Sequence, residues 1–189
     1  MNTKTKNMVG VGLFTAIVVV LQLMGGGIRV GGMFSISLVL VPIVVGAAVY
    51  GWKAGGLLGF VFGLAVLLSG DAAAFLAVDE MGTILTVLLK GTACGLAAGL
   101  CYKLLGRWNS MLAVAAAAVV CPVVNTGIFL IGCKLFFYET VSAWGAAAGF
   151  ENAASYMFFG LAGVNFLLEL GANIVLAPVI SRLIQIGKK

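Results

Sequence analysis

Residues 38–71 read LVLVPIVVGAAVYGWKAGGLLGFVFGLAVLLSGD, and this stretch decides the fold class. Lys53 is the only charged residue in it before Asp71 at its end, so it cannot supply the surface of a soluble domain. Gly51-Trp52 separates two apolar runs, residues 34–50 and 53–70, each of about 17 residues and so close to the length that crosses a bilayer. Two such runs with a glycine between them predict a tight helical hairpin inside a membrane.

The composition of the whole chain agrees with this interpretation. Of the 189 residues, 62% are hydrophobic and 9% are charged, whereas about 25% of the residues in a soluble domain are charged. So few charges exclude a soluble enzyme, a nucleic-acid-binding domain and a disordered tail. Histidine is absent, which excludes histidine zinc sites and Ser-His-Asp triads. We therefore expect no metal and no cofactor.

Apolar stretches repeat along the chain with short polar breaks between them. A spanning helix needs about 20 apolar residues, so we predict an all-α integral membrane bundle of six transmembrane helices. The predicted spans cover residues 7–25, 34–50, 53–70, 82–105, 109–138 and 156–184. The first run is longer than the apolar region of a signal peptide, so we interpret it as a retained span. Nothing between the spans is long enough to fold separately, so residues 1–189 are predicted to form a single domain.

The charged residues predict the orientation of the bundle. With six spans and a cytoplasmic N-terminus, the inner side holds basic residues and no acidic residue, as the positive-inside rule expects. The inner residues are Lys4, Lys6, Lys53, Lys103, Arg107, Arg182, Lys188 and Lys189. The outer side receives Asp71, Asp79, Glu80, Glu139 and Glu151, with Arg29 as its clear basic residue. This asymmetry supports N- and C-termini that are both cytoplasmic.

Two of the predicted outer connections are longer than a hairpin needs. Residues 25–33, GGGIRVGGM, contain five glycines, and residues 139–155 are expected to form a short interfacial helix. Long outer loops on a compact bundle suggest a site that opens outward.

Glycines recur at every fourth position on two of the predicted helices. The two sets are Gly51, Gly55, Gly59 and Gly63 on the third span, and Gly91, Gly95 and Gly99 on the fourth. Residues four apart lie on one helix face, so each set forms a flat groove that another backbone can approach closely. Each groove serves either packing within the bundle or docking of another membrane protein.

Lys90, Lys134 and Glu169 are ionisable residues inside the predicted spans. Burying such a group in hydrocarbon costs much free energy. Each of the three is therefore a candidate functional residue. Lys134 lies about one turn from the outer end of its span, so its ammonium can reach the interface. Lys90 falls in the outer half of the fourth span and shares a helical face with Thr86.

Other polar residues are predicted at the depth of Glu169. Asn165, Glu169 and Asn173 are four residues apart and form a polar stripe on one face of the last span, while Asn125 and Thr126 lie midway along the fifth. A bundle that buries these groups must supply partners for them.

Two interpretations of these residues are open. In one, Lys90 and Glu169 form an internal ion pair, and the asparagines hydrogen-bond to one another. In the other, the residues line a polar cavity that receives a small hydrophilic ligand. The outer position of Lys90 and the long outer loops favour the cavity, where a cation suits a carboxylate or phosphate group of the ligand.

Four stretches together resemble a known family. They are GVGLFTAIVVVLQ (10–22), residues 38–71 as quoted above, GTILTVLLKGTACGLAAGLCYKLLG (82–106) and PVVNTGIFLIG (122–132). Their order and spacing resemble the substrate-binding S component of energy-coupling factor (ECF) vitamin transporters over nearly the whole chain. The overall pattern of these stretches is similar to that of the riboflavin and pantothenate branch of the family.

The resemblance implies a docking helix and a binding region. In the family, small residues four apart on the first span dock on a shared energising transmembrane subunit, which two ATP-binding subunits drive. Gly12 and Ala16 fit that pattern, whereas the flanking Met8 and Val20 do not. Family substrates bind near the outer side, beneath the loop between the first two spans and among spans four to six, where the polar residues of this chain lie.

We therefore expect a substrate-binding subunit of an ATP-driven importer in the lipid bilayer of a bacterial plasma membrane. Its ligand is a vitamin-like solute, and it has neither a nucleic-acid partner nor a catalytic site. The chain lacks a GxxxxGK[ST] loop, so partner subunits hydrolyse ATP. Lys90 favours an anionic vitamin such as pantothenate over riboflavin, whereas a Lys90–Glu169 pair also suits a zwitterion. The alternatives are a stand-alone secondary transporter of a small polar solute, or an intramembrane enzyme using Glu169, Asp71 and Lys90.

Overall fold

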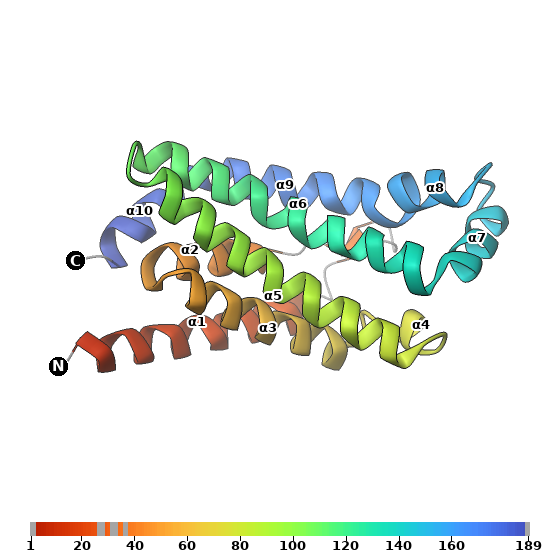
Figure 1. The fold of residues 1–189 in the computed structure, drawn as a ribbon, viewed down its shortest axis with the longest axis horizontal. Helices are drawn as coiled ribbons and strands as arrows, with labels where there is room; N and C mark the ends of the chain where they lie inside the picture. Colours follow the sequence, from red (N-terminus) through yellow and green to blue (C-terminus); the bar gives the residue numbers. More distant parts are fainter. Residues whose placement is uncertain (1–2, 26–28, 31–33, 36–37, 188–189) are drawn as a thin grey trace.

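A computed structural model describes residues 3–25, 29–30, 34–35 and 38–187 of the chain. The fold is a bundle of long helices with a pair of two-residue strands in the connection after the first helix (Figure 1). The elements are α1 (Thr3–Gly25), β1 (Arg29–Val30), β2 (Phe34–Ser35), α2 (Leu40–Tyr50), α3 (Trp52–Ser69), α4 (Ala73–Leu76), α5 (Glu80–Leu105), α6 (Ser110–Phe136), α7 (Tyr138–Ala147), α8 (Ala153–Ser155), the π-helix η1 (Tyr156–Gly163), α9 (Val164–Val175) and α10 (Ala177–Gly187).

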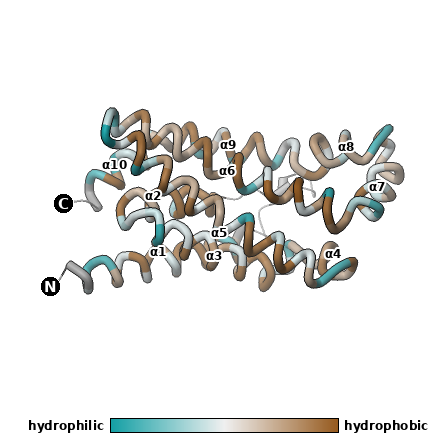
Figure 2. Tube along the Cα trace, viewed as in Figure 1, coloured by the Kyte–Doolittle hydropathy of each residue, from teal (hydrophilic) through white to brown (hydrophobic). Residues whose placement is uncertain are grey.

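The long helices run side by side and define two ends of the bundle. α1 begins and α10 ends at the same end, where the α2–α3 and α5–α6 turns also lie (Figure 1). We call this the terminal end, and the opposite end, which carries α4, α7 and α8, the far end. Hydrophobic residues dominate the middle of the helices, and hydrophilic residues gather towards the two ends (Figure 2). This distribution is the one that a bilayer requires.

Five helical segments of the described chain are long and apolar enough to cross a membrane. They are Thr5–Met24, Trp52–Ser69, Glu80–Leu105, Ser110–Phe136 and Ala153–Val175, the last of which combines α8, η1 and α9. Four of the predicted spans and the N-terminal part of the sixth therefore have helical counterparts of spanning length. The predicted second span, residues 34–50, does not.

The helical part of this second segment is α2, which has 11 residues. It is about 16 Å long at a rise of 1.5 Å per residue, or about half of the hydrocarbon thickness. Residues 34–35 belong to β2, and residues 36–37 lie outside the described ranges. Pro42 falls in the first turn of α2, where its missing N–H would have no intrahelical partner, so it does not kink the helix.

α2 occupies the centre of the bundle. It contacts α1, α3, α5, α6, α9 and α10, and Leu40, Ile43 and Val44 are fully buried. At its end, Gly51 adopts a φ of 95°, which only glycine reaches without strain, and lets α3 start immediately. The predicted helical hairpin is therefore present, with a half-length first arm enclosed by protein.

The last predicted span, residues 156–184, is interrupted at Leu176. Pro178 has no N–H to donate to the carbonyl of Ile174, so the ladder of α9 stops and α10 begins as a separate helix. α10 bends away from α9 at the terminal end (Figure 1).

The glycine grooves of α3 and α5 face each other. A Cβ on Gly59 would overlap the carbonyl oxygen of Gly91, and a Cβ on Gly55 would overlap that of Gly95. A Cβ on Gly99 would in turn lie 2.5 Å from the Cα of Trp52. The grooves thus serve packing within the bundle, and they are closed to any other membrane protein.

The connections at the far end agree in part with expectation. The predicted interfacial helix within 139–155 corresponds to α7. In the predicted glycine-rich loop, residues 26–28 and 31–33 lie outside the described ranges. Residues 29–30 form β1, which pairs antiparallel with β2 through Arg29–Ser35 and Val30–Phe34 and adds a small strand pair to the predicted all-α fold.

We expect Gly59→Ala to lower the free energy of unfolding by about 1–3 kcal/mol, because its methyl group would collide with backbone that cannot rotate away. Thermal unfolding in detergent, followed by tryptophan fluorescence, measures the effect. Gly127→Ala on α6 is the matched control, since no atom lies within 4 Å of a Cβ there. Equal melting temperatures for the wild type and Gly59→Ala would show that the glycine contact is not tight.

Candidate functional site

A polar cavity of about 520 Å³ lies between α3, α5, α6, η1 and α9. This volume is in the range of about 300–1,000 Å³ that small-molecule sites occupy. The cavity is lined by Gln22, Phe62, Val66, Gly70, Asp71, Ala72, Ala73, Ala74, Phe75, Val87, Lys90, Asn125, Thr126, Phe129, Leu161, Ala162, Asn165, Phe166 and Glu169. Residues 70–75, which run from the end of α3 into α4, place its rim at the far end.

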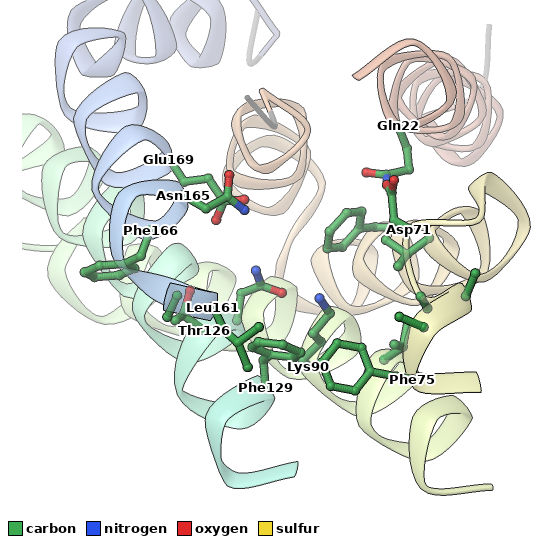
Figure 3. A pocket seen from close by; sticks show the side chains of 18 of the residues that line it. Gln22, Asp71, Phe75, Lys90, Thr126, Phe129, Leu161, Asn165, Phe166 and Glu169 are labelled. Atoms are coloured by element: carbon green, nitrogen blue, oxygen red, sulfur yellow. The ribbon is translucent and has the colours of Figure 1, made fainter. Parts of the chain in front are cut away.

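Lys90 extends from α5 into the polar cavity (Figure 3). Its Nζ lies 5.9 Å from the ring centroid of Phe62 and 5.2 Å from that of Phe129. Aromatic faces attract an ammonium, so the two rings orient it without neutralising its charge. Within the described part of the chain, no ion pair joins Lys90 to a carboxylate.

Glu169 and Asn165 enter the polar cavity from α9, one turn apart (Figure 3). Glu169 is only 6% exposed, as is Asn125, which comes from α6. The Oδ1 atoms of Asn125 and Asn165 have no hydrogen-bond partner among the described residues. Buried polar atoms are nearly always hydrogen-bonded, so these two oxygens are candidates to accept a hydrogen bond from water or a solute in the cavity.

Gln22 and Asp71 form the opposite wall of the polar cavity (Figure 3). Gln22 Nε2 donates to Asp71 Oδ2 at 2.6 Å and to Ser69 Oγ at 3.4 Å, which ties α1 to the end of α3. Gln22 was not predicted as a site residue, although an amide near the end of an apolar span is a detectable signal. Asp71 was considered only as an outer charge and as an enzyme candidate.

Aromatic side chains form another wall of the polar cavity. The ring of Phe75 makes edge contacts with Phe129, Phe137 and Trp144, at centroid separations of 5.6, 5.1 and 5.4 Å. These contacts connect α4, α6 and α7, so the aromatic wall is braced by packing behind it. Leu161 and Ala162 complete the wall from η1, and π-helical turns are frequent at functional sites.

Two predicted site residues lie outside the lining of the polar cavity. Thr86 is buried against α6, where a Cβ on Gly132 would lie 2.5 Å from its Oγ1. Asn173 is 0% exposed and donates through Nδ2 to the backbone oxygen of Glu169 at 2.8 Å. The structure thus brings Lys90, Asn125, Asn165 and Glu169 together, and leaves Thr86 and Asn173 in contacts between or within helices.

The side chains of the polar cavity suit reversible binding. Among the described residues, no group of three or more cysteine or acidic side chains is placed to hold a metal ion. A cation, two carboxylates, three amides and several aromatic rings surround a space of solute size. Such a lining can hold a polar molecule through charge and hydrogen bonds and its carbon skeleton through the rings.

Comparison with known proteins identifies one family. The family described as "ECF transporter, substrate-specific component" matches residues 6–181. This range includes all the residues that line the polar cavity. Neither the curated proteins nor the solved structures give a significant match.

We expect Gln22→Ala and Asp71→Ala to be energetically coupled by about 1 kcal/mol, because each removes the partner of the other. A double-mutant cycle on thermal unfolding measures this coupling. Asp79 caps α5 by accepting from the N–H of Gly82, so Gln22→Ala with Asp79→Ala is the control pair and should be additive. Additivity of Gln22→Ala with Asp71→Ala would mean that this hydrogen bond does not hold α1 to the rim.

Proposed function

The chain belongs to the family of substrate-specific components of ECF transporters, and we propose that it captures a water-soluble vitamin or a related small solute from outside the cell. It is a multi-pass membrane protein and a transport subunit, not an enzyme. In the proposed mechanism, the loaded bundle reorients against an energising transmembrane subunit. Two ATP-binding subunits supply the energy.

The observation that carries this proposal is the unpartnered polar lining of the cavity. Among the described residues, Lys90 makes no ion-pair contact, although Glu169 and Asp71 attract it through space, and the Oδ1 atoms of Asn125 and Asn165 have no donor. Polar groups inside a membrane protein are expensive unless they are paired. A bound solute would supply the missing partners of the groups that line the cavity. Thr86 Oγ1 and Asn173 Oδ1, which also lack a partner among the described residues, lie outside its lining.

The orientation of the charges supports binding from outside. Lys53, Lys103, Arg107 and Arg182 lie at the terminal end, while Asp79, Glu80, Glu139 and Glu151 lie at the far end. Lys134, in the last turn of α6, is an exception to this segregation. By the positive-inside rule, the terminal end would face the cytoplasm, and the rim of the polar cavity would face outward. We propose the plasma membrane of a bacterium as the location.

The proposed count of six crossings follows from the positions of the chain ends. α1 begins and α10 ends at the same end, so the chain would cross an even number of times (Figure 1). Five long helical segments and the shorter α2, together with the chain before it, would complete a single six-helix domain over residues 1–189. The half-length of α2 is compatible with this count because other helices surround it.

We assign the docking face for the energising subunit to Gly12 and Ala16 on α1. Both residues are exposed, and no atom lies within 4 Å of a Cβ on Gly12. Leu13 and Val20, on the outside of the same helix, are 61% and 51% exposed. A helix with small residues and uncovered apolar side chains is suited to close contact with another membrane helix.

The purified chain alone should bind one water-soluble vitamin or related solute with 1:1 stoichiometry in isothermal calorimetry. Ala162→Trp is expected to abolish this binding by filling the polar cavity, and thermal unfolding would check that the variant is folded. Vesicles that contain the chain should take up the solute only when the energising and ATP-binding subunits are present. Uptake by the chain alone would instead favour a stand-alone secondary transporter.

Ala16→Trp should weaken co-purification with the energising subunit by at least about tenfold, because an indole on the docking face prevents close helix contact. The affinity for the solute should be unchanged, since Ala16 does not line the polar cavity. Phe159→Trp, at an exposed position of η1 near the far end, is the control and should assemble normally. Normal assembly of Ala16→Trp would exclude this docking face.

A further inference from the structure

The charged side chains that line the polar cavity are not those expected of a site for an anion. Lys90 provides one positive charge, whereas Asp71 and Glu169 provide two negative charges. The sequence favours an anionic solute on the basis of Lys90 and leaves a zwitterion open because of Glu169. With Asp71 at the rim, a solute with only negative charge would enter a cavity whose own formal charge is already negative.

The charged groups are held apart on different elements. Lys90 extends from α5 between two aromatic rings, and Glu169 extends from α9 beside Asn165 (Figure 3). No ion pair connects them in the described chain, although they share one cavity. The two charges attract each other through space but are not in contact, so each keeps room for a directly bound opposite charge from a solute.

Asp71 is in a different situation. It is exposed, and it already accepts a hydrogen bond from Gln22 at 2.6 Å. Water and the amide therefore solvate this carboxylate. Glu169 is only 6% exposed, so it is the carboxylate that a positively charged group of the solute would contact.

The surroundings of Glu169 extend the same argument. The Oδ1 atoms of Asn125 and Asn165 accept no hydrogen bond from the part of the chain that the structure describes. Together with the carboxylate of Glu169, they offer acceptors from α6 and α9 on the lining of the cavity. A group with several N–H donors and a positive charge, such as an ammonium or an amidinium, satisfies such acceptors.

We infer that the polar cavity selects a zwitterionic solute, with its anionic group on Lys90 and its cationic group on Glu169, Asn165 and Asn125. This inference rests on the proposed function and specifies the class of solute. The carbon skeleton between the two groups lies against Phe75, Phe129 and Phe166. A plain anion leaves Glu169 unmatched, a plain cation leaves Lys90 unmatched, and a neutral solute leaves both.

The first test uses the unaltered protein. The purified chain is incubated with an equimolar mixture of water-soluble vitamins and the twenty amino acids, and native mass spectrometry identifies what it retains. We expect a compound that carries both a cationic and an anionic group at neutral pH. Retention of pantothenate or biotin (anions), thiamine (a cation) or riboflavin (neutral) would overturn the inference and leave the proposed function standing. If nothing is retained, the proposed function itself fails, and the inference falls with it.

The second test assigns the two groups of the retained compound. Lys90→Met and Glu169→Gln should each weaken its binding roughly 10- to 100-fold in calorimetry, because each removes one charge-assisted contact. Lys134→Met and Glu151→Gln change exposed residues outside the cavity and are the matched controls, with affinities within about twofold of wild type. Unchanged affinity in either cavity variant would overturn the assignment.

A third arm alters the compound instead of the protein. The carboxamide of the retained compound should bind wild type at least about tenfold more weakly than the compound itself, and Lys90→Met should lose this preference. Glu169→Gln should keep it. The comparison of the compound and its carboxamide on wild type remains decisive if a variant fails to fold, and equal affinities would overturn the inference.

Discussion

Close contact between the backbones of α3 and α5 determines where the other parts of the bundle lie. Helices in a membrane gain little from hydrophobic burial against one another, so their association depends on packing and polar contacts. Gly55 and Gly59 supply that packing by meeting Gly95 and Gly91 without side chains between them. Lys90 directly precedes Gly91, so its side chain is directed to one side of the contact. The same contact holds Phe62, three residues after Gly59, beside the ammonium.

The short helix α2 explains why there is room for a solute. It occupies the centre of the bundle near the terminal end and contributes none of the described residues that line the polar cavity. Its neighbours α3, α5, α6 and α9 all contribute to the lining. A spanning helix at this position would extend between them over the full thickness. α2 is about half that length, and the cavity is lined by the helices around it instead.

Sequence patterns predicted the contacts that follow from the spacing of residues along one helix. They did not predict how far along the cavity a residue lies or which residue of a neighbouring helix it meets. The glycine period identified the faces of α3 and α5, and polar residues in apolar runs identified Lys90, Asn125, Asn165 and Glu169. The stripe from Asn165 to Asn173 gives a direction around α9 but not a depth. Asn173 therefore shares the face and yet bonds to the backbone of Glu169. Hydropathy could not distinguish the extended residues before α2 from helix, and it could not show that phenylalanines face the cavity rather than lipid.

α1 connects the surface of the bundle with the polar cavity. One side exposes Gly12 and Ala16, whereas Gln22, near its other end, donates to Asp71 at the rim. A hydrogen bond of 2.6 Å to a carboxylate loses most of its strength when the atoms separate by about an ångström. Any displacement of α1 along its axis therefore changes the rim, and a group that competes for Asp71 changes the hold on α1. Because a smaller part of α1 than of α5 is buried, its position depends more on polar contacts such as this one.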